Sequence, residues 1–289
     1  MMPQIEVVRG REYLRLVTRL LQHLRLTDAS GGIWEAADVQ WWSRQERSTD
    51  AAGQVFWVAD GEPVAAVVRT DFGSSVQCDV LSGPGADGDA VCAEALRRAD
   101  GTTEFPVRDD DARLIAALTA AGYGPDRSDG IITSWLAATE RPPVPPLAAG
   151  FRLLSRADAR GGPHPLTARN GAAVADRLRG CSLYRTELDL MVQAPGGQVA
   201  GYGLFWADTV TGVGLVEPMR TEDAFQRRGI ASHLLAAGLA KLAQRGCERL
   251  KVSSDLPLYL RAGFRPDTSA AATVYRAASG VGDAAGLDP

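Results

Sequence analysis

The stretch Gln226-Arg227-Arg228-Gly229-Ile230-Ala231 lies between an apolar run that ends at Val216 and an amphipathic run that begins at Ile230. A glycine turn at the start of a helix presents several unbonded backbone N–H groups, and the helix dipole adds partial positive charge there. The stretch therefore predicts an anion site that would suit phosphate groups. The run after it has the apolar spacing of a helix with one buried face: Ile230, Leu234, Leu235, Leu239 and Leu242.

Two better-known phosphate motifs are excluded. The stretch lacks the Gly-Lys-Ser/Thr ending of a P-loop and the three glycines of a dinucleotide turn. What remains, Gln/Arg-x-x-Gly-x-Gly/Ala after a strand, resembles the acyl-CoA pyrophosphate loop of the GNAT N-acetyltransferase superfamily. Further along, Tyr259-Leu260-Arg261-Ala262-Gly263-Phe264 resembles the Tyr-x-x-x-Gly-Phe segment of the same superfamily.

The order of the expected elements extends this resemblance over residues 150 to 278. The segment Tyr184 to Val192 leads across a Gly196-Gly197 turn into a strand from Val199 to Trp206, which indicates a hairpin. A strand, the glycine loop, a helix, a strand and a helix follow. The resemblance implies an α+β fold in which a mixed, mostly antiparallel sheet is flanked by helices.

A proline-rich segment divides the chain. Glu140-Arg141-Pro142-Pro143-Val144-Pro145-Pro146 continues neither a helix nor a central strand, so it predicts a linker. Similar elements recur on both sides of it, which predicts two tandem GNAT folds. The expected divisions are residues 1–139, a linker at 140–150, a cofactor-binding domain at 151–280 and a tail at 281–289. In the first copy we expect a strand over 131–137 to complete the sheet.

The first copy lacks the residues that carry the chemistry in the second. Its counterpart of the glycine turn, from Ser82 to Asp89, is acidic and would repel a pyrophosphate, and Leu118 stands where the second copy has Tyr259. We therefore expect a degenerate first copy that either walls one side of the acceptor pocket or is purely structural. One active copy in tandem resembles actinobacterial tandem GNAT proteins, including mycothiol-synthase-like enzymes.

Composition excludes several classes. With 289 residues, 45% of them hydrophobic, the chain can bury two cores, and its net charge of −4 argues against nucleic-acid binding. The four cysteines have no metal-ligand spacing, so no metal site is expected. The charged first residues and the absence of a long apolar run predict a cytoplasmic protein without a membrane partner, as a monomer or homodimer.

The resemblance also implies a cofactor, acetyl-CoA, and residues that bind it. The main chain of residues 219–221 would pair with pantetheine, and the amides of residues 227–231 would hold the pyrophosphate. The side chains of Arg227 and Arg228 either pair with phosphate or point into solvent. The full expected set is Met219, Arg220, Thr221, Gln226, Arg227, Arg228, Gly229, Ile230, Ala231 and Ser232.

Two residues are candidates for catalysis. The resemblance implies that Tyr259 is the acid that protonates the leaving thiolate; the alternative is a core tyrosine that only packs its ring. Glu217 ends an apolar strand where the cofactor would bind, which favours a general base whose pKa is raised by burial. The alternatives for Glu217 are an exposed carboxylate paired with Arg220, or a water relay in place of any base. His164 has no evident partner in the sequence.

The expected function is acetyl-CoA-dependent N-acetyltransfer to the amine of a small molecule, by direct transfer in a ternary complex. A protein or peptide acetyltransferase and a non-catalytic acyl-CoA-binding module remain the alternatives. Specificity for the acceptor and for the acyl length resides in loops and pocket volume, for which the sequence carries no transferable motif.

Overall fold

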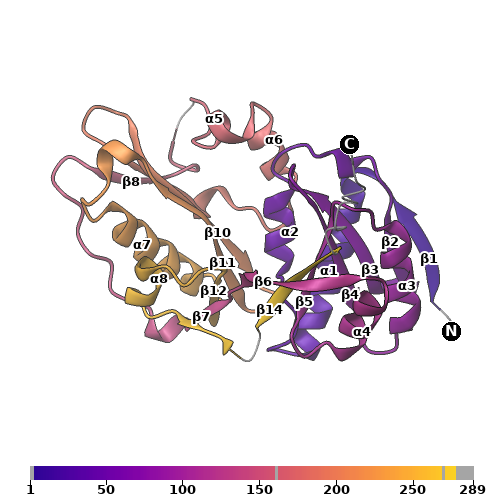
Figure 1. The fold of residues 1–289 in the computed structure, drawn as a ribbon. Helices are drawn as coiled ribbons and strands as arrows, with labels where there is room; N and C mark the ends of the chain where they lie inside the picture. Colours follow the sequence, from indigo (N-terminus) through magenta and orange to yellow (C-terminus); the bar gives the residue numbers. More distant parts are fainter. Residues whose placement is uncertain (1–2, 160–161, 269–270, 278–289) are drawn as a thin grey trace, which may run out of the picture.

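The computed structural model describes residues 3–159, 162–268 and 271–277. Within these ranges the chain forms two seven-stranded sheets that lie side by side, each flanked by helices (Figure 1). The predicted pair of mixed sheets with flanking helices is confirmed. The half before the linker contains β1 (Gln4–Val8), α1 (Tyr13–Thr27), α2 (Ala36–Trp42), β2 (Gln54–Ala59), β3 (Glu62–Asp71), β4 (Val76–Ser82), α3 (Gly88–Arg98), β5 (Thr103–Arg108), α4 (Ala112–Ala120), β6 (Tyr123–Ile131) and β7 (Ser134–Ala137).

The half after the linker repeats this order. It contains β8 (Arg152–Ser155), α5 (Thr167–Asn170), α6 (Val174–Arg179), β9 (Asp189–Gln193), β10 (Val199–Asp208), β11 (Val213–Thr221), α7 (Ile230–Gln244), β12 (Arg249–Val252), α8 (Pro257–Arg261), β13 (Arg265–Pro266) and β14 (Ala272–Ala277). The predicted hairpin is β9–β10, which pair in antiparallel fashion.

The two halves exchange one strand each. The first sheet has the order β1-β2-β3-β4-β5-β14-β6, and the second has the order β13-β7-β12-β11-β10-β9-β8. In Figure 1, β14, in yellow, reaches across to lie between β5 and β6. The expectation that a strand ending at Ala137 completes the first sheet is wrong, because β7 pairs with β12 and β13 of the second. The domain boundaries at residues 139 and 151 stay a prediction.

Helix α7 packs closely on the second sheet because of a glycine. A Cβ at Gly238 would lie 2.1 Å from the ring of Phe205 on β10, so any side chain there would displace the helix or the ring. Glycine inside a helix costs about 1 kcal/mol relative to alanine. The burial of Phe205, which is 1% exposed, offsets that cost.

The halves also share a core and a buried ion cluster. One group of buried apolar side chains runs from α1 and α2 into β10, where it includes Trp206. Beside it, Lys251 of β12 is fully buried and lies 3.3 Å from a carboxylate oxygen of Asp38 and 3.6 Å from one of Glu35. Because that lysine comes from one half and both carboxylates from the other, the cluster ties the two halves together.

The described residues contain neither a metal-ligand cluster nor a membrane-spanning helix. No group of histidine, cysteine and acidic side chains among them could hold a metal ion. Nor does any helix in those residues have the length and apolarity needed to cross a membrane. All four cysteines are buried and free.

Candidate active site

A gap opens between β11 and β12. Their parallel ladder runs only from Val213 to Leu215, after which the two strands separate. On the other edge of β11, the register with β10 shifts between Gly203, opposite Met219, and Phe205, opposite Val216. This bulge leaves Glu217 next to the gap, and bulges are a common way of redirecting a side chain at a functional site.

The start of α7 presents free donors. Gly229, the residue before the helix, has φ of 76°, and Arg227 has φ of 60°, so both adopt the left-handed conformation. No side chain caps the helix. Within the described ranges, the backbone N–H groups from Arg227 to Ser232 donate to no protein acceptor. These unbonded amides lie where the sequence predicts an anion site.

The two loop arginines are available to an anion. Arg227 and Arg228 are exposed, and neither forms an ion pair with any described residue. The guanidinium of Arg228 lies 5.8 Å from the centre of the Phe225 ring. Gln226 donates to Asp223, and Arg220 pairs with Glu222 and Asp223, so these two side chains are occupied within the loop.

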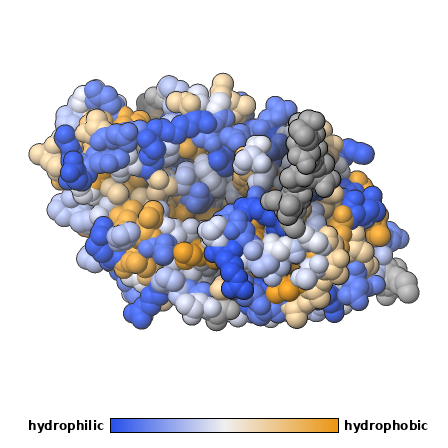
Figure 2. All heavy atoms as spheres, viewed as in Figure 1, coloured by the Kyte–Doolittle hydropathy of each residue, from blue (hydrophilic) through white to orange (hydrophobic). Residues whose placement is uncertain are grey.

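The remaining predicted cofactor residues line the same region. Met219, Arg220 and Thr221 are half-buried and pair with β10 through one edge of their strand. Ile230 is buried, Ala231 half-buried and Ser232 exposed. Ser232 lines a cavity of about 120 Å³ bounded by α7, α8 and the linker prolines. Hydrophobic residues gather over the part of the surface where α7 and α8 lie (Figure 2). The free amides, free arginines and open strand edge fit acetyl-CoA.

Glu217 is half-buried, and helix α2 of the other half of the protein packs on its strand. Burial raises the pKa of Glu217 to about 7; Asp38 acts in the same direction, and Arg44 and a hydrogen bond from Trp41 oppose it. Arg220, its expected partner in the alternative interpretation, instead pairs with Glu222 and Asp223. The geometry therefore gives a carboxyl group that exchanges a proton near neutral pH.

Tyr259 lies close enough to Glu217 to be influenced by its charge. Burial, and then the charge of Glu217, raises the pKa of Tyr259 to about 12, so the phenol is protonated at neutral pH. Its ring packs edge-on against Phe264 at 6.0 Å between centroids. Among the described residues none bonds to its hydroxyl, which leaves the O–H free to donate.

Helix α2 supplies residues that the sequence did not single out. It contacts β10 and β11, and Trp41 and Asp38 lie on it. Arg44, just after the helix, stacks on the Trp41 ring at 3.8 Å and donates to Asn170 at 2.5 Å. Only the packing of α2 on the second sheet brings these residues to Glu217, and spacing along the sequence did not mark them as site residues.

His164 has a partner after all. Its imidazole bonds to Asp189 at 2.7 Å, and the hydroxyl of Tyr184 bonds to the same carboxylate at 2.6 Å. His164 and Asp189 lie far apart in sequence, which is why no pattern revealed them. His164 and Asp189 are buried and Tyr184 is half-buried, so the three side chains form one hydrogen-bonded cluster at the start of β9.

The first half differs at the equivalent of the glycine turn. There, the side chain of Asp87 caps α3 by accepting from the N–H of Ala90, and Asp89 lies in the first turn. A carboxylate thus occupies the place where α7 leaves its donors free. This difference is a physical reason to expect that the first copy does not hold a pyrophosphate at this turn.

Comparison with known proteins agrees with this geometry. Residues 167–264 match the model of the acetyltransferase (GNAT) family. A tandem GNAT protein from the clavulanic acid biosynthesis pathway superposes with a TM-score of 0.65 at 14% identity, over 96% of this chain and 99% of that one. A GCN5-related N-acetyltransferase from Sphaerobacter thermophilus gives 0.54 at 17% identity, over 96% of both chains. No curated protein matched.

At these identities the solved structures establish the shared fold, and the match to the family model lies within the second half. The match spans the free amides of α7, the open edge of β11 and Tyr259. We conclude that the chain has the fold of two tandem GNAT domains, and that residues 167–264 of the second domain match the acetyltransferase (GNAT) family model.

Proposed function

We propose that the protein transfers an acetyl group from acetyl-CoA to the amine of a small molecule, by direct transfer in a ternary complex. One observation carries the proposal: the carboxyl of Glu217 and the phenol of Tyr259, from different elements, lie close enough beside the gap between β11 and β12 for the charge of Glu217 to raise the pKa of Tyr259. A base and an acid at one place are what acyl transfer to an amine needs.

Each residue then has a defined task. The amides of residues 227–232, with Arg227 and Arg228, would hold the pyrophosphate, and the free edge of Met219 to Thr221 would hold pantetheine. Bound in this way, the cofactor would supply the acetyl thioester. Glu217 would accept a proton from the acceptor amine on a carboxylate oxygen. Tyr259 would keep its proton on the phenolic oxygen, as a donor at the end of the gap.

Two features support direct transfer to a small acceptor. Cys247 lies beyond the far end of α7, and burial raises its pKa to about 11, which disfavours an acyl-thiol intermediate on the protein. The packing of α2 over β10 and β11 places Trp41 and Arg44 beside Glu217, so both halves border the acceptor space. An acceptor space bordered by both halves would suit a small molecule better than an extended peptide.

The test is release of free thiol from acetyl-CoA with a panel of small amines. Tyr259→Phe and Glu217→Gln should each lower turnover by about 10²-fold or more while cofactor affinity changes little. Tyr275→Phe is the matched control, because that tyrosine is equally buried, at 8% exposure, but lies in the first sheet. If both site variants bind cofactor and retain full turnover, the assigned roles are wrong. Cofactor binding without turnover in the parent would indicate a binding module.

A further inference from the structure

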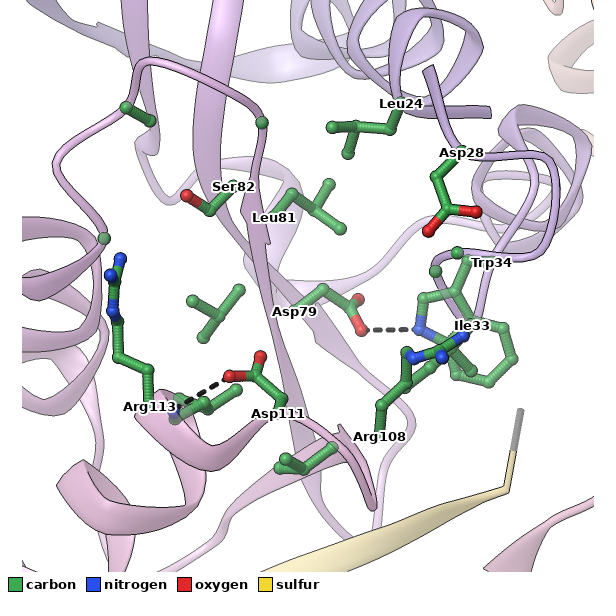
Figure 3. A pocket seen from close by; sticks show the side chains of 18 of the residues that line it. Leu24, Asp28, Ile33, Trp34, Asp79, Leu81, Ser82, Arg108, Asp111 and Arg113 are labelled. Atoms are coloured by element: carbon green, nitrogen blue, oxygen red, sulfur yellow. Dashed lines mark hydrogen bonds between the residues drawn. The ribbon is translucent and has the colours of Figure 1, made fainter. Parts of the chain in front are cut away.

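The first half retains an open cleft where the second half has its cofactor gap. Strands β4 and β5 pair in parallel only at Val76 and Gln77 and then separate, as β11 and β12 do. A cavity of about 600 Å³ lies beyond the point of separation, bordered by α3 and α4 and by the segment after α1. Figure 3 shows side chains from these elements around a common space.

This cleft is unsuited to a pyrophosphate. The carboxylate of Asp87 already accepts from the first turn of α3, and Asp89 adds a second negative charge to that turn. The guanidinium of Arg113 lies against Gly88, where a Cβ would meet its terminal nitrogen, and pairs with Asp89. At α7 the first-turn N–H groups are free for an anion. At α3 the corresponding groups are capped by Asp87 or face the negative charge of Asp89.

The cleft nevertheless holds a buried carboxylate in the position of Glu217. Gln77 is the last β4 residue paired with β5, and Asp79 follows two residues later, just as Glu217 follows Leu215 on β11. Asp79 is 4% exposed and accepts from the indole N–H of Trp34 at 2.8 Å and from the amide of Gln77 at 3.0 Å (Figure 3).

No cation balances Asp79. Both of its donors are neutral, and within the described residues no lysine, arginine or histidine lies within ion-pair distance of it. Burial raises the pKa of Asp79 to about 7, and nearby Asp38 adds to the effect. A buried carboxylate without a counter-ion is costly, and a ligand cation would remove that cost.

The walls around Asp79 are mostly apolar. They include Leu24, Ile33, Trp34, Leu81, Val107 and Leu114. The charged residues nearest the opening are satisfied by the protein: Arg108, for example, pairs with Asp110 at 2.6 Å. We propose that this cleft is a second binding site, which takes a small molecule made of an apolar body and one protonated amine, without phosphate. The proposal does not depend on the function assigned to the second half.

The experiment uses matched probes on the full-length protein. Isothermal calorimetry would compare 3-phenylpropylamine with 3-phenylpropanoate, which have the same apolar body and opposite charges, and with coenzyme A. We expect saturable binding of the amine and at least about tenfold weaker binding of the carboxylate, because the ammonium would form a charge-assisted hydrogen bond with Asp79 whereas the carboxylate would meet a like charge.

Variants locate the binding. Asp79→Asn should weaken amine binding by about tenfold or more, and Leu81→Trp should abolish it by filling the cleft without altering any charge. Two controls should bind the amine like the parent. The first control, Asp208→Asn, changes a buried carboxylate outside this cleft that also accepts a hydrogen bond from an amide side chain. The second control, Glu217→Gln, changes the proposed acceptor site of the second half. Circular dichroism would verify that each variant folds.

Several results would overturn the proposal. They are the absence of saturable amine binding at millimolar concentration, equal binding of both phenyl probes, and unchanged binding in folded Asp79→Asn. Amine binding lost in Glu217→Gln but retained in Leu81→Trp would also overturn it, because it would place the amine in the second half. So would coenzyme A binding that Leu81→Trp removes.

Discussion

The pH dependence of catalysis tests whether Glu217 is the base. Burial beneath α2 raises its pKa to about 7, so the ionised fraction is about 0.9 at pH 8 and about 0.1 at pH 6. If only the ionised form accepts the amine proton, kcat/KM should fall about tenfold from pH 8 to pH 6. A carboxyl with an ordinary pKa near 4.5 would remain almost fully ionised over this range.

The assay needs an acceptor that does not titrate itself. A weakly basic amine that is unprotonated above pH 6 keeps its own ionisation out of the profile, and kcat/KM then reports groups of the free enzyme. Glu217→Gln should have low activity and no limb near pH 7. A flat parent profile between pH 6 and pH 8, or the same limb in Glu217→Gln, would refute the assignment.

A second variant checks the electrostatic cause. Arg44 lowers the pKa of Glu217 by favouring the charged carboxylate. Removing that cation in Arg44→Gln should therefore move the limb to higher pH, on the order of half a unit for a partly screened charge. A downward shift would show that the charge of Arg44 does not act on Glu217 in the way the structure indicates.

Three further predictions concern stability and cofactor binding. Lys251→Met should destabilise the protein by about 3–5 kcal/mol in chemical denaturation, because it leaves buried Asp38 and Glu35 without their lysine; a change below about 1 kcal/mol would contradict the ion cluster. Arg227→Ala combined with Arg228→Ala should weaken coenzyme A binding several-fold and flatten its salt dependence, with unchanged salt dependence counting against phosphate contact. Either half expressed alone should fail to unfold cooperatively, since its sheet lacks the strand that the other half supplies, whereas the two halves expressed together should form a complex; a stable isolated half would show that the exchanged strands are dispensable.

Local features of the sequence predicted the parts of the fold that depend on neighbours along the chain. The start of α7 followed from the glycine turn and the leucine spacing, and the β9–β10 hairpin followed from Gly196-Gly197 between two apolar runs. The acidic segment before α3 predicted a helix start that repels anions, and the carboxylate of Asp87 caps that helix. In each case the deciding interaction spans only a few residues.

Contacts between distant segments were not predictable in this way. Nothing in the segment ending at Ala137 distinguishes a strand of the first sheet from one of the second, because the choice depends on which sheet edge is open. The pairing of His164 with Asp189 and the position of Asp79 in the first cleft were missed for the same reason. Each depends on elements brought together only by folding.

The sequence by itself determined that a glycine turn opens helix α7 and that the fold occurs twice, and it predicts an anion site at this turn that the first copy lacks. It left Glu217 undecided between an exposed strand-end carboxylate and a base. The tertiary structure decided its environment: α2 of the first half packs on β11, Glu217 is half-buried there, and the partial loss of water raises its pKa. The desolvation of a carboxyl group depends on which surfaces pack against it in the folded protein, and the spacing of residues along one strand does not predict that packing.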